Sequence, residues 1–163
     1  MTAEEQLTYL SASAENTINL GRRLGRVLER DDVVALTGEL GSGKTWFTKG
    51  LALGLEVSKD IIITSPSFSL VNEYEGRLTF FHMDAYRLER LSEFLSAGLD
   101  EYFYRGGVVV MEWADRWPEI LPDSRLRVHF TILDDSTRRI TFSGFHPRAL
   151  DILKNLEHSS GRG

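Results

Sequence analysis

The sequence predicts an α/β fold, in which flanking helices cover a mixed sheet of about seven strands, part parallel and part antiparallel. Two short apolar runs, Val33–Leu36 and Val108–Met111, are rich in β-branched residues, which is typical of buried strands. Two other regions hold pairs of strand-like segments around a turn and predict hairpins. Segments with apolar residues at helical spacing separate these strands, so helices are expected to cover the sheet.

The first part of the chain predicts a short strand at Leu7–Leu10 and a helix on either side of the strand that begins at Val33. Ser13 is expected to cap the first helix, which continues to Glu29 because apolar residues recur at helical spacing. The second helix is expected over Lys44–Leu53, with Gly54 just beyond its end.

A basic stripe lies along the first of these helices. Arg22, Arg26 and Arg30 recur at helical spacing on the face opposite the apolar residues. Such a stripe is either a solvated helix face, which is the simpler interpretation, or a docking surface for an acidic partner.

The middle and the end of the chain predict smaller elements. The middle should contain a brief strand at Ile61–Ile63, a hairpin of Phe68–Tyr74 and Arg77–Met83 around Glu75–Gly76, and one or two helices over Leu88–Phe103 that break near Gly98. The end should contain loop at Pro118 and Pro122, a hairpin of Leu126–Leu133 and Arg139–Phe145 around Asp134–Thr137, a helix from Pro147 to Glu157, and a disordered tail at Ser159–Gly163.

Composition bounds the possible functions. The 163 residues correspond to a single domain, and a net charge of −5 argues against autonomous binding of nucleic acid. The absence of cysteine excludes a disulfide framework, a thiolate zinc site and a cysteine nucleophile. The sequence has neither a secretory signal nor an apolar run of the ~20 residues that span a bilayer, so we expect a cytoplasmic protein.

One motif carries the chemistry. Residues 38–45, GELGSGKT, match the phosphate-binding pattern G-x-x-x-x-G-K-[ST] and lie between a predicted strand and a predicted helix. Its backbone N–H groups and the helix N-terminus are expected to cradle phosphates, and the motif predicts a P-loop NTPase-like fold. Lys44 should reach the β- and γ-phosphates, and Thr45 should bind Mg²⁺. The nucleotide-binding residues expected here are Glu39, Leu40, Gly41, Ser42, Gly43, Lys44, Thr45 and, through its N–H, Trp46.

Two carboxylates follow predicted strands and are candidates for positioning Mg²⁺. Asp84 ends the strand that begins at Arg77, and Glu112 ends the Val108–Met111 strand. Ligands in open α/β sheets gather at the carboxyl ends of strands, so each carboxylate is a candidate metal ligand or catalytic group. The residues do not decide which one binds the metal directly. Thr64–Phe68 is a hydroxyl-rich loop, either a γ-phosphate sensor or an ordinary turn, and we assign no metal role to His82.

Several segments together resemble the TsaE family of bacterial ATPases, which are needed to make threonylcarbamoyladenosine (t6A) in tRNA. The similar segments are GELGSGKTWFTKG at 38–50, TSPSF at 64–68, HMDAYRL at 82–88 and EW at 112–113, and the similarity extends from Leu10 to Leu133. The P-loop is common to many families, but its combination with the other three segments is much more specific.

The resemblance implies roles for particular residues. Lys44 would act on ATP, Thr45 would bind Mg²⁺, Asp84 would be the essential carboxylate, and Glu112 would help to hold the metal ion. Trp113 would be a functionally sensitive neighbour, Thr17 would lie near the adenine, and the switch-like loop would comprise Ser65, Pro66, Ser67 and Phe68. The family usually has threonine at Ser67 and a small residue at Trp46, so we expect a somewhat looser loop and no loss of the backbone contact.

The resemblance also implies ATP and Mg²⁺ as cofactors, and as partner the protein heterodimer that transfers threonylcarbamoyl to tRNA. The tRNA would be contacted only indirectly. Because no catalytic arginine or glutamine is evident in the sequence, we expect slow hydrolysis without the partner. A small P-loop kinase and a non-catalytic nucleotide-binding module are the alternatives, whereas a GTPase would require guanine-recognition and switch motifs that the sequence lacks. We expect residues 1–158 to form a single P-loop ATPase domain.

Overall fold

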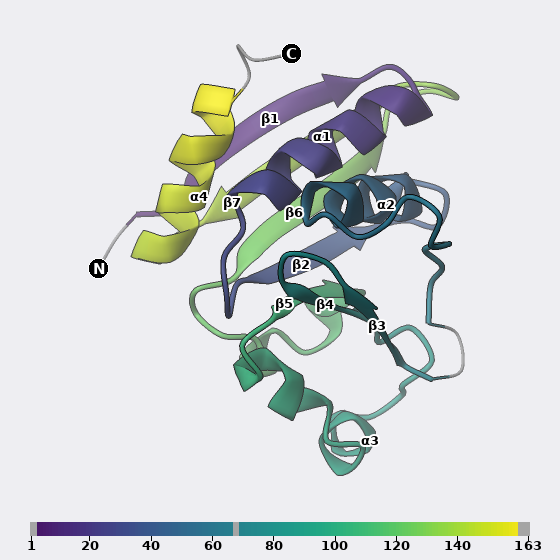
Figure 1. Cartoon of the computed structure of the whole chain (residues 1–163), viewed down its shortest axis with the longest axis vertical. Helices are drawn as coiled ribbons and strands as arrows, with labels where there is room; N and C mark the ends of the chain where they lie inside the picture. Colours follow the sequence, from purple (N-terminus) through teal and green to yellow (C-terminus); the bar gives the residue numbers. More distant parts are fainter. Residues whose placement is uncertain (1–2, 67–68, 160–163) are drawn as a thin grey trace.

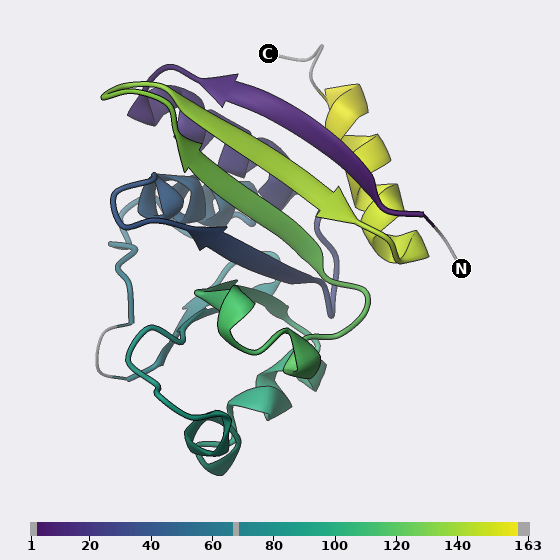
Figure 2. The same ribbon diagram turned by 180° about the vertical axis from the view of Figure 1, so that it is seen from behind.

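The computed structural model describes residues 3–66 and 69–159 and contains one seven-stranded sheet covered by helices on both faces (Figures 1 and 2). The strands are β1 Glu5–Ser11, β2 Val33–Gly38, β3 Val71–Glu75, β4 Thr79–Asp84, β5 Val108–Glu112, β6 Leu126–Ile132 and β7 Arg138–Gly144. The α-helices are α1 Ala14–Val27, α2 Lys44–Gly54, α3 Leu91–Ser96 and α4 Pro147–His158. Three 3₁₀ helices are η1 Leu99–Tyr104, η2 Ala114–Arg116 and η3 Pro118–Ile120. The predicted fold class is confirmed.

The sheet is parallel at its centre and antiparallel at both ends. Its strand order is β1-β7-β6-β2-β5-β4-β3. Strand β2 pairs in parallel with β5 and β6, and β5 pairs in parallel with β4, whereas β1–β7, β6–β7 and β3–β4 are antiparallel. The carboxyl ends of β2, β4 and β5 therefore meet at one edge of the sheet.

The two faces of the central strands have separate apolar cores. Val34 and Leu36 of β2 face α1 and α2, which lie in front of the sheet in Figure 1. Val33 and Ala35 face the other side, where α3 and the 3₁₀ helices pack. Because both faces of β2 are buried, the strand is a continuous apolar run in the sequence.

Helices α1 and α2 approach each other through glycines. A Cβ atom at Gly21 would collide with the carbonyl oxygen of Phe47, and one at Gly50 would collide with that of Ile18. Gly54 was expected beyond the end of the second helix, but it is the last residue of α2. Its role is close packing, since a Cβ there would meet the carbonyl oxygen of Arg22.

Several predicted boundaries are wrong for identifiable reasons. Residues 61–63 form no strand, because no neighbouring strand pairs with them and the Ile62 side chain is 79% exposed. Arg77 lies in the turn and not in β4, because its N–H donates to the carbonyl of Leu55 and its guanidinium donates to that of Leu28. Pro118 begins η3 instead of lying in plain loop.

Other predictions hold or need a shift. The helical region breaks at Gly98, as predicted, with φ at +71° between α3 and η1. Arg30 does not continue the basic stripe, because α1 ends at Val27 and the Arg30 side chain donates to the carbonyl of Gly106. Ser159, expected in the tail, donates to the carbonyl of Leu156 at the end of α4. Ser67, Phe68 and residues 160–163 lie outside the described residues.

The described helices lack the features of a membrane span. In residues 3–66 and 69–159 no helix has both the length and the apolar character needed to cross a bilayer.

Candidate functional site

The P-loop connects the buried end of β2 to the first turn of α2. Gly38, Gly41 and Gly43 have φ values of +142°, +77° and +104°, which residues with a Cβ atom rarely adopt. At Gly38 a Cβ would also lie 2.8 Å from the carbonyl oxygen of Phe130. Around Gly41, in contrast, no atom lies within 4 Å of a Cβ position, so the loop has open space beside it. The backbone is thus shaped to let an anion approach the N-terminus of α2.

A cavity of about 310 Å³ opens in front of this loop. It brings together residues from four separate stretches of the sequence: the P-loop, Ser65, the end of β4 and the end of β5. The predicted site residues that line it are Leu40, Gly41, Gly43, Lys44, Thr45, Trp46, Ser65, Asp84, Glu112 and Trp113, and Tyr86 lines it as well. Glu39 and Ser42 belong to the loop but do not line this cavity. Pro66, which follows Ser65 in the sequence, is buried and does not line it either.

The two carboxylates face this cavity because of the sheet register. Asp84 of β4 and Glu112 of β5 are direct partners in parallel strands, so their side chains project on the same face. Burial raises the pKa of the Asp84 carboxyl, although the N–H of Tyr86, which donates to its Oδ1 at 2.9 Å, opposes that shift. The nearby charge of Glu112 raises the Asp84 pKa further. The charged form of the Asp84 carboxyl is therefore disfavoured relative to that of an ordinary aspartate.

Burial disfavours the charged form of Lys44 as well. Its side chain is buried, and burial lowers the pKa of its ammonium group, while Glu112, Asp84 and Asp115 partly offset this. The ammonium donates to the carbonyl oxygen of Gly38 at 2.6 Å and lies 4.0 Å from the centre of the Trp113 ring. A cation over an aromatic face is attracted to the ring, so the Trp113 ring stabilises the ammonium that it covers. Trp113 itself has φ at +61°, an uncommon conformation for a bulky residue.

His82 was assigned no metal role from the sequence, and the structure places it beside Glu112. Its Nε2 lies 2.7 Å from Glu112 Oε2, and both side chains are almost completely buried. Ser65 donates to the same oxygen at 3.3 Å. Alternation along β4 puts His82 and Asp84 on one face, which was the available signal, but only the pairing of β4 with β5 identifies Glu112 as its neighbour.

A second cavity of about 290 Å³ shares Gly41, Gly43 and Trp46 with the first and also includes Thr17. Thr17 is buried, and its hydroxyl lies 2.7 Å from that of Ser11. The sequence analysis missed the remaining lining residues, which come from the start of α1 and the β6–β7 turn: Ser13, Ala14, Asp135, Ser136 and Arg138. Arg138 donates to the carbonyl of Gly41 at 3.2 Å, a contact over 97 positions that no local pattern signals.

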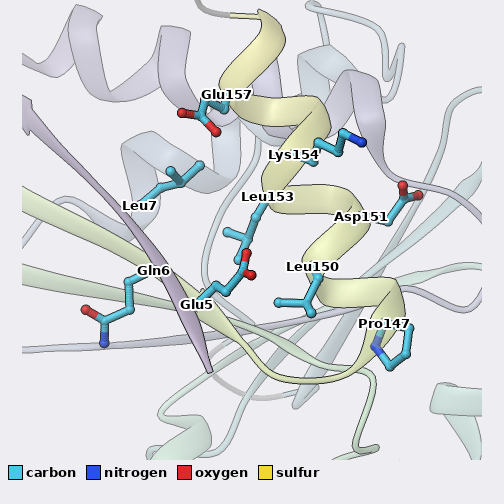
Figure 3. A pocket seen from close by; sticks show the side chains of 9 residues that line it. All are labelled: Glu5, Gln6, Leu7, Pro147, Leu150, Asp151, Leu153, Lys154 and Glu157. Atoms are coloured by element: carbon cyan, nitrogen blue, oxygen red, sulfur yellow. The ribbon is translucent and has the colours of Figure 1, made fainter. Parts of the chain in front are cut away.

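Two other cavities are larger than these. One, of about 670 Å³, adjoins the P-loop on the side of β6 and includes Tyr86 and Trp113, whose ring centres are 5.0 Å apart. The other, of about 510 Å³, lies between β1 and α4, where Leu150 and Leu153 point towards the strand (Figure 3). None of the residues that line the β1–α4 cavity belongs to the P-loop, β4 or β5.

The donor set fits a nucleotide with Mg²⁺. Thr45, Asp84 and Glu112 offer a hydroxyl and two carboxylates, the oxygen ligands that Mg²⁺ prefers. Across the described ranges, no group of three or more His, Cys, Asp or Glu side chains could hold a metal ion by itself. A metal ion here would thus depend on phosphate oxygens as well, as Mg²⁺ does in nucleotide sites.

Comparison with known proteins gives the family. The sequence profile described as "Threonylcarbamoyl adenosine biosynthesis protein TsaE" matches residues 11–140. The chain belongs to the TsaE family. The TsaE match runs from the last residue of β1 into the start of β7 and therefore includes the P-loop, both carboxylates and the β6–β7 turn.

Individual relatives agree with this assignment to TsaE. The "tRNA threonylcarbamoyladenosine biosynthesis protein TsaE" of Treponema pallidum is 46% identical over 132 residues, which are 81% of this chain and 96% of the relative. The Bacillus subtilis protein of the same name is 41% identical over 140 residues, or 85% of this chain and 86% of the relative. The crystal structure of Bacillus subtilis YdiB superposes with a TM-score of 0.82 at 34% identity and covers 98% of this chain and 99% of the other.

Proposed function

We propose that this TsaE protein is a Mg²⁺-dependent ATPase that supports the t6A modification of tRNA from within a complex with the threonylcarbamoyl-transfer heterodimer. One observation carries the proposal: a P-loop lysine, a hydroxyl and two strand-end carboxylates line one cavity. The names of the relatives connect the family to t6A biosynthesis. The proposed compartment is the cytoplasm, in agreement with the absence of cysteine.

The P-loop supplies the binding chemistry of the proposed reaction. The N-terminus of α2 and the ammonium of Lys44 attract the phosphates, for which Lys44 exchanges its bond to the Gly38 carbonyl. Thr45 and Glu112 would hold Mg²⁺, which supplies positive charge to the transferred phosphoryl group when bound. Asp84 would orient the attacking water or the metal hydration shell, and its raised pKa makes its carboxylate a better proton acceptor than an ordinary aspartate.

The second cavity is proposed to take the nucleoside. It shares the P-loop with the first cavity but includes neither Asp84 nor Glu112, so a nucleotide whose γ-phosphate faces those carboxylates extends towards Thr17 and Trp46. Arg138 and Ser136 then lie on the same side as the base and the ribose.

Slow hydrolysis by the isolated chain is part of the proposal. Among the described residues, those that line the 310 Å³ cavity include neither arginine nor glutamine, the groups that usually complete a P-loop site. Supplying such a group changes kcat by ~10³–10⁵ in P-loop enzymes, so a partner that inserts one would control the reaction. The net charge of −5 agrees with a subunit that leaves most of the tRNA contact to its partner.

The deciding experiment measures ATP hydrolysis by the purified chain with and without the purified heterodimer, with Lys44→Ala as control. We expect a slow rate alone, a strong increase with the heterodimer, and no increase for Lys44→Ala. A rate that ignores the heterodimer would contradict the partner assignment. Fast hydrolysis by the chain alone, on the order of 10 s⁻¹, would contradict partner control.

A further inference from the structure

His82 is a fully buried polar residue that the proposed chemistry does not yet use. Its exposed fraction is 0%, it lies on β4 two positions before Asp84, and its ring stacks on Phe80 at a centroid distance of 6.1 Å. A buried imidazole needs a reason, because each ring nitrogen loses its bonds to water. The reason lies in what its two nitrogens contact.

Only one of the two ring nitrogens has a partner. Nε2 lies 2.7 Å from Glu112 Oε2, whereas Nδ1 is buried without a hydrogen bond to any described residue. With the proton on Nε2, the imidazole donates to the carboxylate and leaves only a bare acceptor nitrogen unpaired. The reverse tautomer would bury an unpaired N–H and set a lone pair against a carboxylate oxygen. The geometry therefore makes His82 the donor to Glu112.

Both donors to Glu112 converge on a single oxygen. The Ser65 hydroxyl donates to Oε2 at 3.3 Å from the side of the Thr64–Phe68 loop, while His82 donates from β4. Two donors from different elements fix the rotation of the carboxylate about its last bond. They also occupy Oε2, so Oε1 is the oxygen that stays available for a metal ion or its bound water.

We infer that His82 is a positioning residue, which holds the Glu112 carboxylate in the orientation needed for Mg²⁺ and thereby raises the Mg²⁺ affinity of the nucleotide site. The inference rests on the proposed function, because it assumes that Glu112 serves Mg²⁺. It adds to that function a residue that acts through Glu112 and does not itself contact nucleotide or metal. Residues that orient metal ligands typically contribute about 10–100-fold to metal affinity.

The test measures how binding of a fluorescent ADP analogue depends on Mg²⁺ concentration, which requires no turnover. His82→Phe keeps a ring of similar size and removes the donor, and His82→Gln keeps an N–H at the end of the side chain. We expect His82→Phe to raise the half-saturating Mg²⁺ concentration by about 10-fold or more. Mg²⁺-free binding of the analogue should stay within about two-fold, and His82→Gln should recover most of the loss.

Two controls separate positioning from general destabilisation. Phe80→Leu disturbs the same buried stack without contacting Glu112, so it should lower the unfolding midpoint and leave the Mg²⁺ dependence unchanged. Adding His82→Phe to Glu112→Gln should shift the Mg²⁺ midpoint little beyond Glu112→Gln alone, because a residue that acts through Glu112 has nothing left to position.

The outcomes distinguish the inference from the proposed function. A wild-type Mg²⁺ midpoint in folded His82→Phe, while Glu112→Gln shifts it, would overturn the role of His82 and leave the site intact. Unchanged midpoints in both variants would overturn the role of Glu112 in Mg²⁺ binding and the inference with it. If His82→Phe does not fold, then His82→Gln and Ser65→Ala decide, since Ser65→Ala removes the second donor and should give a smaller shift in the same direction.

Discussion

A buried charged side chain lies near each end of strand β2, and the two side chains differ in how well they are paired. Before its first residue, Asp32 accepts two hydrogen bonds from Arg148, at 2.8 and 2.7 Å, and a third from the N–H of Glu29 at 2.6 Å. After its last residue, the Lys44 ammonium has one hydrogen bond, to the carbonyl of Gly38, and no carboxylate within salt-bridge distance among the described residues.

The pKa values follow this difference. The hydrogen bonds that Arg148 donates to Asp32 raise the pKa of Arg148, so the guanidinium favours its charged form. Burial lowers the pKa of Lys44 and raises that of Asp84, so both groups at the other end are disfavoured in their charged forms. One end of β2 is thus built for stability, and the other keeps under-satisfied charges that a phosphate and a metal ion would satisfy.

Lys44→Met tests this comparison with the largest expected effect. The variant removes the phosphate-facing charge, so heterodimer-stimulated hydrolysis should fall at least ~100-fold, as for other losses of electrostatic stabilisation. Its stability to urea should be no lower than that of the wild type, because a poorly solvated cation is removed. The lowered Lys44 pKa means that the native state holds fewer protons, so the wild type should gain stability relative to Lys44→Met as pH rises towards 10.5. A clear loss of stability at neutral pH would contradict the comparison.

Asp84→Asn should also abolish most hydrolysis while nucleotide binding persists. Because burial raises the pKa of Asp84 above its ordinary 3.8, this carboxyl holds more protons in the native state than in the unfolded state at pH values between the two pKa values. Wild-type stability should therefore fall relative to Asp84→Asn as pH rises from about 3.8 through the raised pKa. Urea unfolding at several pH values measures this difference, and a pH-independent difference would show that the Asp84 charge is well tolerated.

Arg148→Met is the matching experiment at the other end of the strand. It leaves the Asp32 carboxylate buried without its partner, which should cost about 3 kcal/mol of unfolding free energy. Nucleotide affinity measured with a fluorescent ADP analogue should be unchanged. Combining Arg148→Met with Asp32→Asn should recover part of the loss, since no buried charge is then left unpaired. A loss below about 1 kcal/mol would place Arg148 among ordinary surface residues.

Arg138→Ala should have the smallest effect. The variant removes the bond from Arg138 to the Gly41 carbonyl and a side chain that lines the proposed nucleoside cavity. One hydrogen bond of this kind contributes about 1 kcal/mol, which corresponds to a loss of roughly five-fold in ADP affinity. Thr141→Ala on the same strand, whose hydroxyl bonds only to that of Thr8 among the described residues, is the matched control and should bind ADP like the wild type.

The predictable part of the fold was the part with strong local patterns. The P-loop glycines, the apolar runs of β2 and β5, and the Gly98 break each produce a signal within a few residues. Ile61–Ile63 shows where this fails, because three apolar residues have strand-like character but no neighbouring strand to pair with. Arg77 shows the same for a boundary, since long-range bonds to Leu55 and Leu28 hold it in the turn.

The sequence by itself determined the P-loop and the strand-end positions of Asp84 and Glu112, because short-range patterns encode them, and the resemblance of four segments indicated the family. Tertiary structure decided which side chains meet: His82 with Glu112 through the pairing of β4 and β5, and Arg138 with Gly41 across the sheet. It also decided which charges are satisfied, since Asp32 and Lys44 are both buried but Asp32 has an ion-pair partner distant in sequence, Arg148. The physical reason is that strand pairing, burial and dielectric environment arise only when separate segments pack together.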